Sequence, residues 1–265
     1  FRGSVARIII KLMSFRRIFI LTLSLSTLGA FAAELAVPPP SIHPIDRTSA
    51  GPVAWWRLSG LSKKQVTNLA KQHNARLVDI DVDSRSPDRF SVLMIKNSGI
   101  YQRDWWWYFN ITENEINTLA HKHQARILRL KSLHDKQRAR FSVILVKPPS
   151  ATSIPWWWQH DIAPEKLNLF LKTNDARLVD LDIESMHPLR FNAVMVANRG
   201  MNKTPSWFYF GKSEKQLQDL LRQHQARLID LKRYSHGNKI LFAAVMIPST
   251  NPQSSKEWWY INLPG

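Results

Sequence analysis

The chain of 265 residues contains no cysteine. Disulfides and thiolate catalysis are therefore excluded, and stability must come from packing. Glycine is scarce as well, with nine residues, and no glycine-rich phosphate loop occurs. The sequence also lacks Ser-x-x-Lys, Gly-x-Ser-x-Gly and His-Glu-x-x-His, which mark serine hydrolases and zinc peptidases. These absences predict a chain that is not an enzyme and binds no cofactor.

The remaining polar groups give weak support for catalysis or metal binding. Carboxylates recur in pairs, Asp79 with Asp81 and Asp180 with Asp182, and strand alternation predicts that they lie on a solvated face. Histidines recur at one position of successive segments, where they suit the C-terminus of a helix. Copies on separate segments would be too far apart to share an ion, so we expect no metal site.

Acidic side chains are outnumbered. The chain has 37 Lys and Arg against 20 Asp and Glu, a formal net charge of +17. Such a charge favours binding to acidic polymers, wall polyanions or anionic lipid head groups. Nucleic acid is the other partner that this charge suits. The basic residues are scattered and no RNA-recognition or helix-turn-helix signature occurs, so we expect no nucleic-acid partner.

Tryptophan is abundant and recurs at intervals of about fifty residues, a sign of repeated units that bury their apolar faces against one another. The eleven tryptophans lie at Trp55-Trp56, Trp105-Trp106-Trp107, Trp156-Trp157-Trp158, Trp207 and Trp258-Trp259. An Ala-Arg pair and a phenylalanine keep the same interval. The arginines of these pairs are Arg76, Arg126, Arg177 and Arg227, and the phenylalanines are Phe90, Phe141, Phe191 and Phe242.

Each unit is predicted to contain a strand, a helix and two further strands. The tryptophan cluster continues into apolar residues that favour a short buried strand. Ser62, Thr112 and Ser213 each stand three residues before a Gln or Glu, the spacing of a capping box at a helix start. In the third unit Ala163 takes the cap position and Pro164 the first helical position. The Ala-Arg and Phe segments, joined by turn residues, predict an antiparallel hairpin.

The sequence therefore predicts an α+β fold of four tandem units. The units are residues 53–104, 105–155, 156–206 and 207–257, and the segment 258–265 is only the first strand of a fifth. If each tryptophan strand packs against the preceding hairpin, this fragment caps the fourth unit. A closed ring would not need such a cap. We therefore expect an open, curved array, with a closed ring as the alternative.

The pattern resembles the bacterial tandem repeats that accompany beta-lactamase-like serine hydrolases, including the N-terminal region of polyglycine hydrolases. The matching features are the tryptophan cluster, the capped helix, the segment Ala176–Leu181 and a Phe-containing strand that ends near Asn198–Gly200. The resemblance covers residues 52–263. It implies a structural or substrate-positioning repeat domain without the catalytic half of that architecture.

The N-terminal region indicates export. After Met13, Arg16 and Arg17 precede an apolar run, and Ala30-Phe31-Ala32 offers a small-residue cleavage site. The run is shorter than the roughly 20 residues of a membrane span. Residues 1–32 are predicted to be upstream sequence and a signal peptide, and residues 33–52 a proline-rich lead-in. We expect a periplasmic or secreted protein with no integral membrane span after cleavage.

The candidate binding surface combines tryptophans and arginines. In a run of three tryptophans the middle ring points away from its neighbours, so Trp106 and Trp157 are candidates for stacking on glycan or peptide. Trp56, in the first cluster, is added to them. Alternation places Arg76 on the same apolar face as Val78 and Ile80. The full candidate set is Trp56, Trp106, Trp157, Arg76, Arg126, Arg177 and Arg227. The arginines could instead serve stability, by stacking on tryptophan or binding strand carbonyls.

The sequence favours an exported, non-enzymatic repeat protein that binds a cell-wall polymer, glycan or protein partner, or that positions a substrate. The alternative is a serine-hydrolase-associated or hydrolytic enzyme that acts on peptides.

Overall fold

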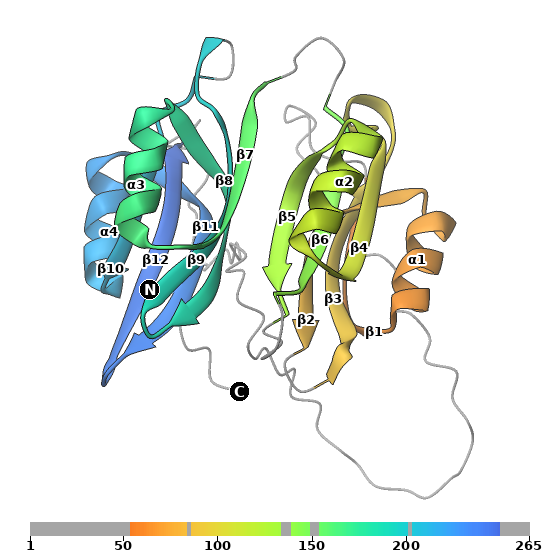
Figure 1. The fold of residues 1–265 in the computed structure, drawn as a ribbon, viewed down its shortest axis with the longest axis horizontal. Coiled ribbons are helices and arrows are strands. Elements are labelled where there is room, and N and C mark those ends of the chain that lie inside the picture. Colours follow the sequence, from red (N-terminus) through yellow and green to blue (C-terminus); the bar gives the residue numbers. More distant parts are fainter. Residues whose placement is uncertain (1–53, 84–85, 134–138, 149–153, 201–202, 250–265) are drawn as a thin grey trace, which may run out of the picture.

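A computed structural model describes residues 54–83, 86–133, 139–148, 154–200 and 203–249 (Figure 1). In this part of the chain the protein is a mixed structure in which strands predominate, with four α-helices and four three-stranded antiparallel sheets. The order strand, helix, strand, strand occurs four times. The predicted signal peptide, the lead-in and the cap 258–265 lie outside the described residues.

Grouped by the predicted units, the elements stand in the same order along the chain. The first unit holds β1 (Trp55–Leu61), α1 (Lys63–Gln72), β2 (Ala75–Asp83) and β3 (Ser86–Lys96), followed by the short 3-10 helix η1 (Gly99–Tyr101). The second holds β4 (Trp105–Ile111), α2 (Glu113–His123), β5 (Arg126–Ser132) and β6 (Phe141–Val146). The third holds β7 (Trp156–Ile162), α3 (Pro164–Thr173), β8 (Ala176–Met186) and β9 (Leu189–Ala197). The fourth holds β10 (Trp207–Lys212), α4 (Glu214–Gln223), β11 (Ala226–His236) and β12 (Lys239–Pro248).

The Phe-containing strand is central in every sheet. The strand orders are β1-β3-β2, β4-β6-β5, β7-β9-β8 and β10-β12-β11. The antiparallel hairpin predicted for the last two strands of each unit is confirmed. The tryptophan strand pairs with the other side of the central strand. Both edge strands are antiparallel to the central one, so they run parallel to each other and the helix connects them.

The predicted helix starts are confirmed. Ser62, Thr112 and Ser213 each accept a hydrogen bond from the backbone of the residue three positions later, whose side chain bonds back to the cap. These capping boxes satisfy N–H groups that would otherwise lack partners. Ala163 provides no side-chain cap, and Pro164 stands at the first helical position, where its missing N–H costs nothing.

A β-bulge recurs in the Ala-Arg strand of every unit. The pairing register shifts between Leu77 and Asp79, and equivalent shifts occur in β5, β8 and β11. The extra residue reverses the alternation, so Leu77 and Ile80 share one face while Arg76 and Asp79 share the other. The prediction that Arg76 lies on the same face as Ile80 is therefore wrong, because strict alternation ignores the bulge.

Aromatic rings join each unit to the next. Three edge-to-face pairs occupy equivalent positions, namely Phe90–Trp107, Phe141–Trp158 and Phe191–Phe208, with centroid distances of 5.5, 5.8 and 5.7 Å. Each phenylalanine is fully buried in the core of its own unit, and its partner comes from the tryptophan strand of the following unit. The backbone of that strand thus pairs within its own unit, while its side chains pack on the preceding one.

The four Ala-Arg strands β2, β5, β8 and β11 lie towards the middle of the molecule, whereas α1 and α4 lie at the two outer sides of the view (Figure 1). The Ala-Arg strands contact one another in chain order, β2 with β5, β5 with β8 and β8 with β11. Equivalent positions of successive units are therefore brought together in the middle.

Candidate functional site

The convergence of the Ala-Arg strands brings three sets of charged residues together, each set from one repeat position. The arginine row is Arg76, Arg126, Arg177 and Arg227. The second row is Asp79, Arg129, Asp180 and Asp230. The third row is Asp81, Lys131, Asp182 and Lys232. Because of the bulge, all three rows lie on the sheet face opposite the Leu77 position.

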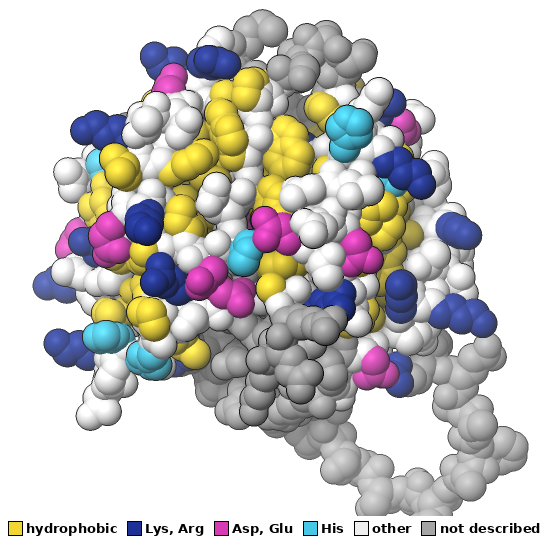
Figure 2. Space-filling model, in the orientation of Figure 1, with side chains coloured by type: hydrophobic (Ala, Val, Ile, Leu, Met, Phe, Trp, Pro, Cys, Tyr) yellow, Lys and Arg dark blue, Asp and Glu magenta, His cyan; other side chains and the backbone are white. Residues whose placement is uncertain are grey.

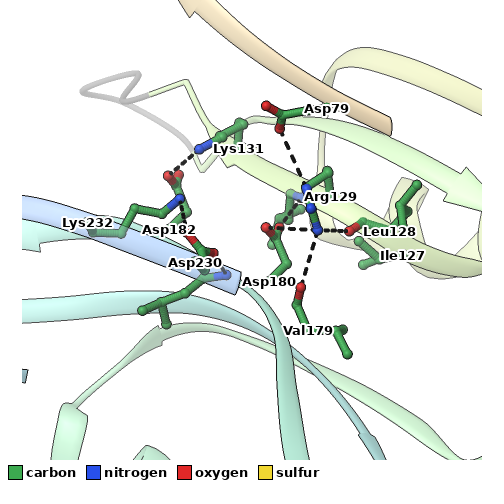
Figure 3. A network of polar contacts seen from close by, with 12 residues as sticks. Asp79, Ile127, Leu128, Arg129, Lys131, Val179, Asp180, Asp182, Asp230 and Lys232 are labelled. Atoms are coloured by element: carbon green, nitrogen blue, oxygen red, sulfur yellow. Dashed lines mark hydrogen bonds and ion pairs between the residues drawn. The ribbon is translucent and has the colours of Figure 1, made fainter. Parts of the chain in front are cut away.

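Arg129 is the centre of the second row (Figure 3). Its Nε lies 3.6 Å from Oδ1 of Asp79 in the first unit, and its Nη1 lies 3.7 Å from Oδ1 of Asp180 in the third. The same Nη1 donates hydrogen bonds to the carbonyl oxygens of Leu128 and Val179, at 3.0 and 3.2 Å. One guanidinium group therefore connects three units.

The aspartates also bond to the backbone of the preceding unit, as the two equivalent contacts in the second row show. Oδ2 of Asp180 accepts the N–H of Leu130 at 2.7 Å, and Oδ2 of Asp230 accepts the N–H of Leu181 at 2.9 Å. Both N–H groups directly follow a bulge. These carboxylates therefore fix the offset between neighbouring Ala-Arg strands.

The third row contains alternating charges. Nζ of Lys131 lies 3.1 Å from Oδ1 of Asp182, and Nζ of Lys232 lies 2.8 Å from Oδ1 of Asp230 (Figure 3). Both lysines are buried. A buried ammonium group persists in its charged form only with a close carboxylate, so these pairs are integral to the core.

The prediction that the paired aspartates face solvent is wrong. Asp79 and Asp180 are each 1% exposed. A single strand would leave this face open to water, but the neighbouring Ala-Arg strands cover it. Pattern reasoning on one unit could not anticipate this cover.

The buried charges shift one another's pKa values. Burial raises the pKa of Asp180 to about 7, with Arg129 opposing the shift and Asp230 adding to it. Burial acts on Asp230 too, but the ion pair with Lys232 holds the pKa of that carboxyl below its usual range. The second and third rows together contain five carboxylates and three cations. A proton on one carboxyl reduces this excess of negative charge, in line with the raised pKa of Asp180.

The arginine row has a different environment from the second and third rows. Within the described parts of the chain, none of its members forms an ion pair with a carboxylate. Nε of Arg76 donates to the carbonyl of Tyr101 at 3.1 Å, and Nη1 of Arg126 donates to the carbonyl of Ile127 at 3.3 Å. Nε of Arg177 is buried and has no hydrogen-bond partner among the described residues.

Repulsion adds to burial at these arginines. Burial lowers the pKa of Arg126, and the nearby charges of Arg177 and Arg129 lower it further. Burial also lowers the pKa of Arg76 and of Arg177. Half-buried guanidinium groups that face like charges are suited to an anion, because an anion would offset both the desolvation and the repulsion.

The candidate tryptophans lie against the helices of their own units. Trp56 and Trp106 stack on histidines at the C-terminal ends of α1 and α2, with centroid distances of 4.7 and 4.0 Å, and Trp157 packs on Phe170 at 5.8 Å. Trp56 is 9% exposed, whereas the neighbouring Trp55 is 39% exposed. The structure therefore brings Arg126 and Arg177 close enough to repel each other. Each candidate tryptophan packs against the helix of its own unit, and Trp106 also lines a cleft towards α1.

Sequence reasoning did not single out Arg129, Lys131 or Lys232. Two signals mark them. At the second-row position the second unit has Arg where the other three have Asp, and at the third-row position Asp and Lys alternate along the chain. Opposite charges at equivalent positions of neighbouring units indicate contact between those positions.

Among the described residues, no group of three or more His, Asp or Glu is arranged to hold a metal ion. No helix in the described ranges is long and apolar enough to cross a membrane. No protein family model matches the chain, and no curated protein matches it. Functional inference therefore depends on the geometry of the residues themselves.

We expect Arg129→Met to lower the free energy of unfolding by about 3–5 kcal/mol, because it leaves two buried carboxylates without their cation. Urea denaturation at pH 7 measures this loss. The matched control is Arg89→Met, which removes an exposed arginine 4.0 Å from Asp88 and should cost less than about 1 kcal/mol. Equal stability of the two variants would show that the buried network contributes no more than a surface pair.

The raised pKa of Asp180 predicts a pH dependence of stability. The folded protein binds this proton more tightly than the unfolded chain, whose Asp pKa is near 3.8. The stabilisation is therefore complete below about pH 4 and is lost as pH rises to about 7. Asp180→Asn should remove a slope on the order of 1 kcal/mol per pH unit between about pH 5 and 7. Urea titrations across this range, with the exposed Asp219→Asn as control, measure the slope. An unchanged slope in Asp180→Asn would contradict the assignment.

Proposed function

We propose that this chain is an exported, non-enzymatic repeat protein that binds an anionic envelope polymer through its arginine row. The observation that carries the proposal is the contrast between neighbouring rows. The buried cations of the second and third rows have carboxylate partners, whereas the described residues provide none for the arginine row. Guanidinium groups bind phosphate and carboxylate oxygens in a bidentate manner, so arginines without a carboxylate partner suit either anion.

The distribution of charge supports a local site rather than a broad patch. The chain carries a formal net charge of +17, which attracts polyanions over a distance of about a Debye length. Figure 2 shows Lys and Arg side chains scattered over the face in view, many of them towards its edges, with acidic residues and histidines between them. A general attraction of this kind concentrates the polymer, and the arginine row would supply the specific contact.

The resemblance to repeats beside beta-lactamase-like serine hydrolases supports the same role. In that architecture such repeats imply a module that positions a substrate for a separate catalytic part. The rival function is hydrolysis of peptides by this chain itself. A peptidase and esterase screen of the purified protein tests it, and turnover above the buffer rate would favour the rival.

The double variant Arg126→Gln/Arg177→Gln should bind inorganic polyphosphate at least about tenfold more weakly, because it removes two charge-assisted contacts. Isothermal titration calorimetry at about 0.05 M and 0.5 M salt measures the affinity and its screening. The control is Lys63→Gln/Lys64→Gln on the exposed face of α1, which removes the same charge. If both double variants lose affinity equally, binding depends on net charge and the proposed site is wrong.

We propose further that the units form an open array with polar and aromatic ends. At the first unit, Arg57 and Ser59 are exposed at the positions where the second unit has Trp107 and Phe109, which pack on Phe90. A polar outer face suits a terminal unit of an array. At the other end, Trp259 and Ile261 take the sequence positions of Trp107 and Phe109. This correspondence supports a capping strand over the fourth unit.

Deletion of residues 258–265 should therefore destabilise the fourth unit. Two large aromatic side chains, each burying roughly 150–250 Å² at about 25 cal/mol per Å², would contribute several kcal/mol. We expect aggregation, or early proteolysis within Lys212–Arg233, seen by limited digestion and mass spectrometry. The control lacks only Pro264 and Gly265 and should resist digestion. A monomeric deletion variant with unchanged melting temperature would instead favour the closed ring.

A further inference from the structure

Two clefts lie between successive units at equivalent places. One of about 640 Å³ lies between α1 and β4, and its lining includes Thr67, Lys71, Trp105, Trp107 and Tyr108. In Figure 1, β4 lies between α1 and α2, so this cleft is at the first junction of the array. The other, of about 250 Å³, lies between α3 and β10 at the third junction.

The clefts share their chemistry as well as their location. Asn168 and Lys172 of α3 occupy the repeat positions of Thr67 and Lys71 of α1. Each cleft thus has a lysine and a short polar side chain from a helix on one wall. Aromatic rings from the tryptophan strand of the next unit form the other wall, with Trp207 and Phe208 in the third junction.

The second junction is held together by direct contacts. Nε1 of Trp158 donates a hydrogen bond to Oδ1 of Asn117 at 2.9 Å. Asn117 occupies the repeat position of Thr67. Nε2 of His160 lies 2.8 Å from Oε2 of Glu113. These two contacts join α2 to β7 directly, so the second junction differs in its polar contacts from the two junctions at which the clefts described above lie.

We propose that these clefts bind sugar rings of an acidic polysaccharide, an inference that depends on the proposed function and specifies its ligand. Indole faces offer flat apolar surfaces for the C–H faces of a sugar ring, while the hydroxyl and amide groups of the helix wall suit its hydroxyls. The lysine of each cleft suits a carboxylate or phosphate on the ring. Recurrence of the cleft along the array matches a ligand that itself repeats, and multivalent binding raises its affinity.

The sharpest test exchanges one wall residue for its natural counterpart in another unit. Trp105→Ser copies Ser206, which lies at the same repeat position and lines the third-junction cleft. The matched control is Trp55→Ser, at the same position of the first unit, where no helix of a preceding described unit forms a cleft. Each full-length variant is titrated with oligogalacturonate, with its neutral methyl ester, with polyglutamate and with inorganic polyphosphate.

Trp105→Ser should weaken oligogalacturonate binding on the order of tenfold, because an aromatic contact is lost. Trp55→Ser should leave oligogalacturonate binding unchanged, and Trp105→Ser should leave polyphosphate binding unchanged. Lys71→Gln should reduce the preference for oligogalacturonate over its methyl ester. Unchanged oligogalacturonate binding by Trp105→Ser, or tighter Trp105-dependent binding of polyglutamate, would overturn the sugar assignment.

The two proposals can fail separately. If the parent protein binds polyphosphate but no oligogalacturonate, the clefts are not sugar sites, and the arginine row remains the proposed anion site. If polyphosphate does not bind the parent protein, the proposed function fails, and the Trp105 comparison still decides the cleft.

Discussion

The placement of the units depends on buried ion pairs between neighbouring Ala-Arg strands. Arg129 lies within ion-pair distance of Asp79 and Asp180, so the first three units share one guanidinium group. A buried charge is costly unless it is paired and hydrogen-bonded, and removal of one partner leaves the other uncompensated. Slippage of one unit against its neighbour would separate these pairs. The charges therefore specify how the units are placed, while the aromatic pairs between units supply the apolar contact.

The β-bulge is the local feature that makes this arrangement possible. Without the extra residue, Arg76 and Asp79 would lie on opposite faces of β2. The bulge brings both to one face and leaves Leu77 and Ile80 to pack under the helix. It also exposes N–H groups that the next unit's aspartates accept, as Asp180 does from Leu130. One irregularity in the strand therefore provides the apolar core, the charged rows and the contact between units.

Much of the local structure could be predicted because it depends on short-range chemistry. The capping boxes at Ser62 and Thr112 need only residues three apart, and the hairpins need only turn residues between two apolar runs. The side on which Asp79 lies could not be predicted, because the bulge leaves no clear mark in composition. Its burial depends on a neighbouring unit about fifty residues away. The charged network was therefore missed although its residues were visible.

The second unit departs from the repeat in the second row, and this departure shows how the rows differ in charge. With Asp at all four second-row positions, four carboxylates would meet in a buried place with no cation among them. Arg129 replaces one carboxylate by a cation and reduces that repulsion. In the third row the lysines do the same for Asp182 and Asp230. The arginine row has no such exception, because its four members are alike in charge. Among the described residues, Arg76 and Arg126 bond to carbonyl oxygens, and no member of the row pairs with a carboxylate. One acidic residue in the arginine row would reduce the repulsion among its members, just as Arg129 and the lysines reduce the repulsion among carboxylates in the second and third rows. The uniform positive charge is the feature on which the proposed binding of an external anion depends.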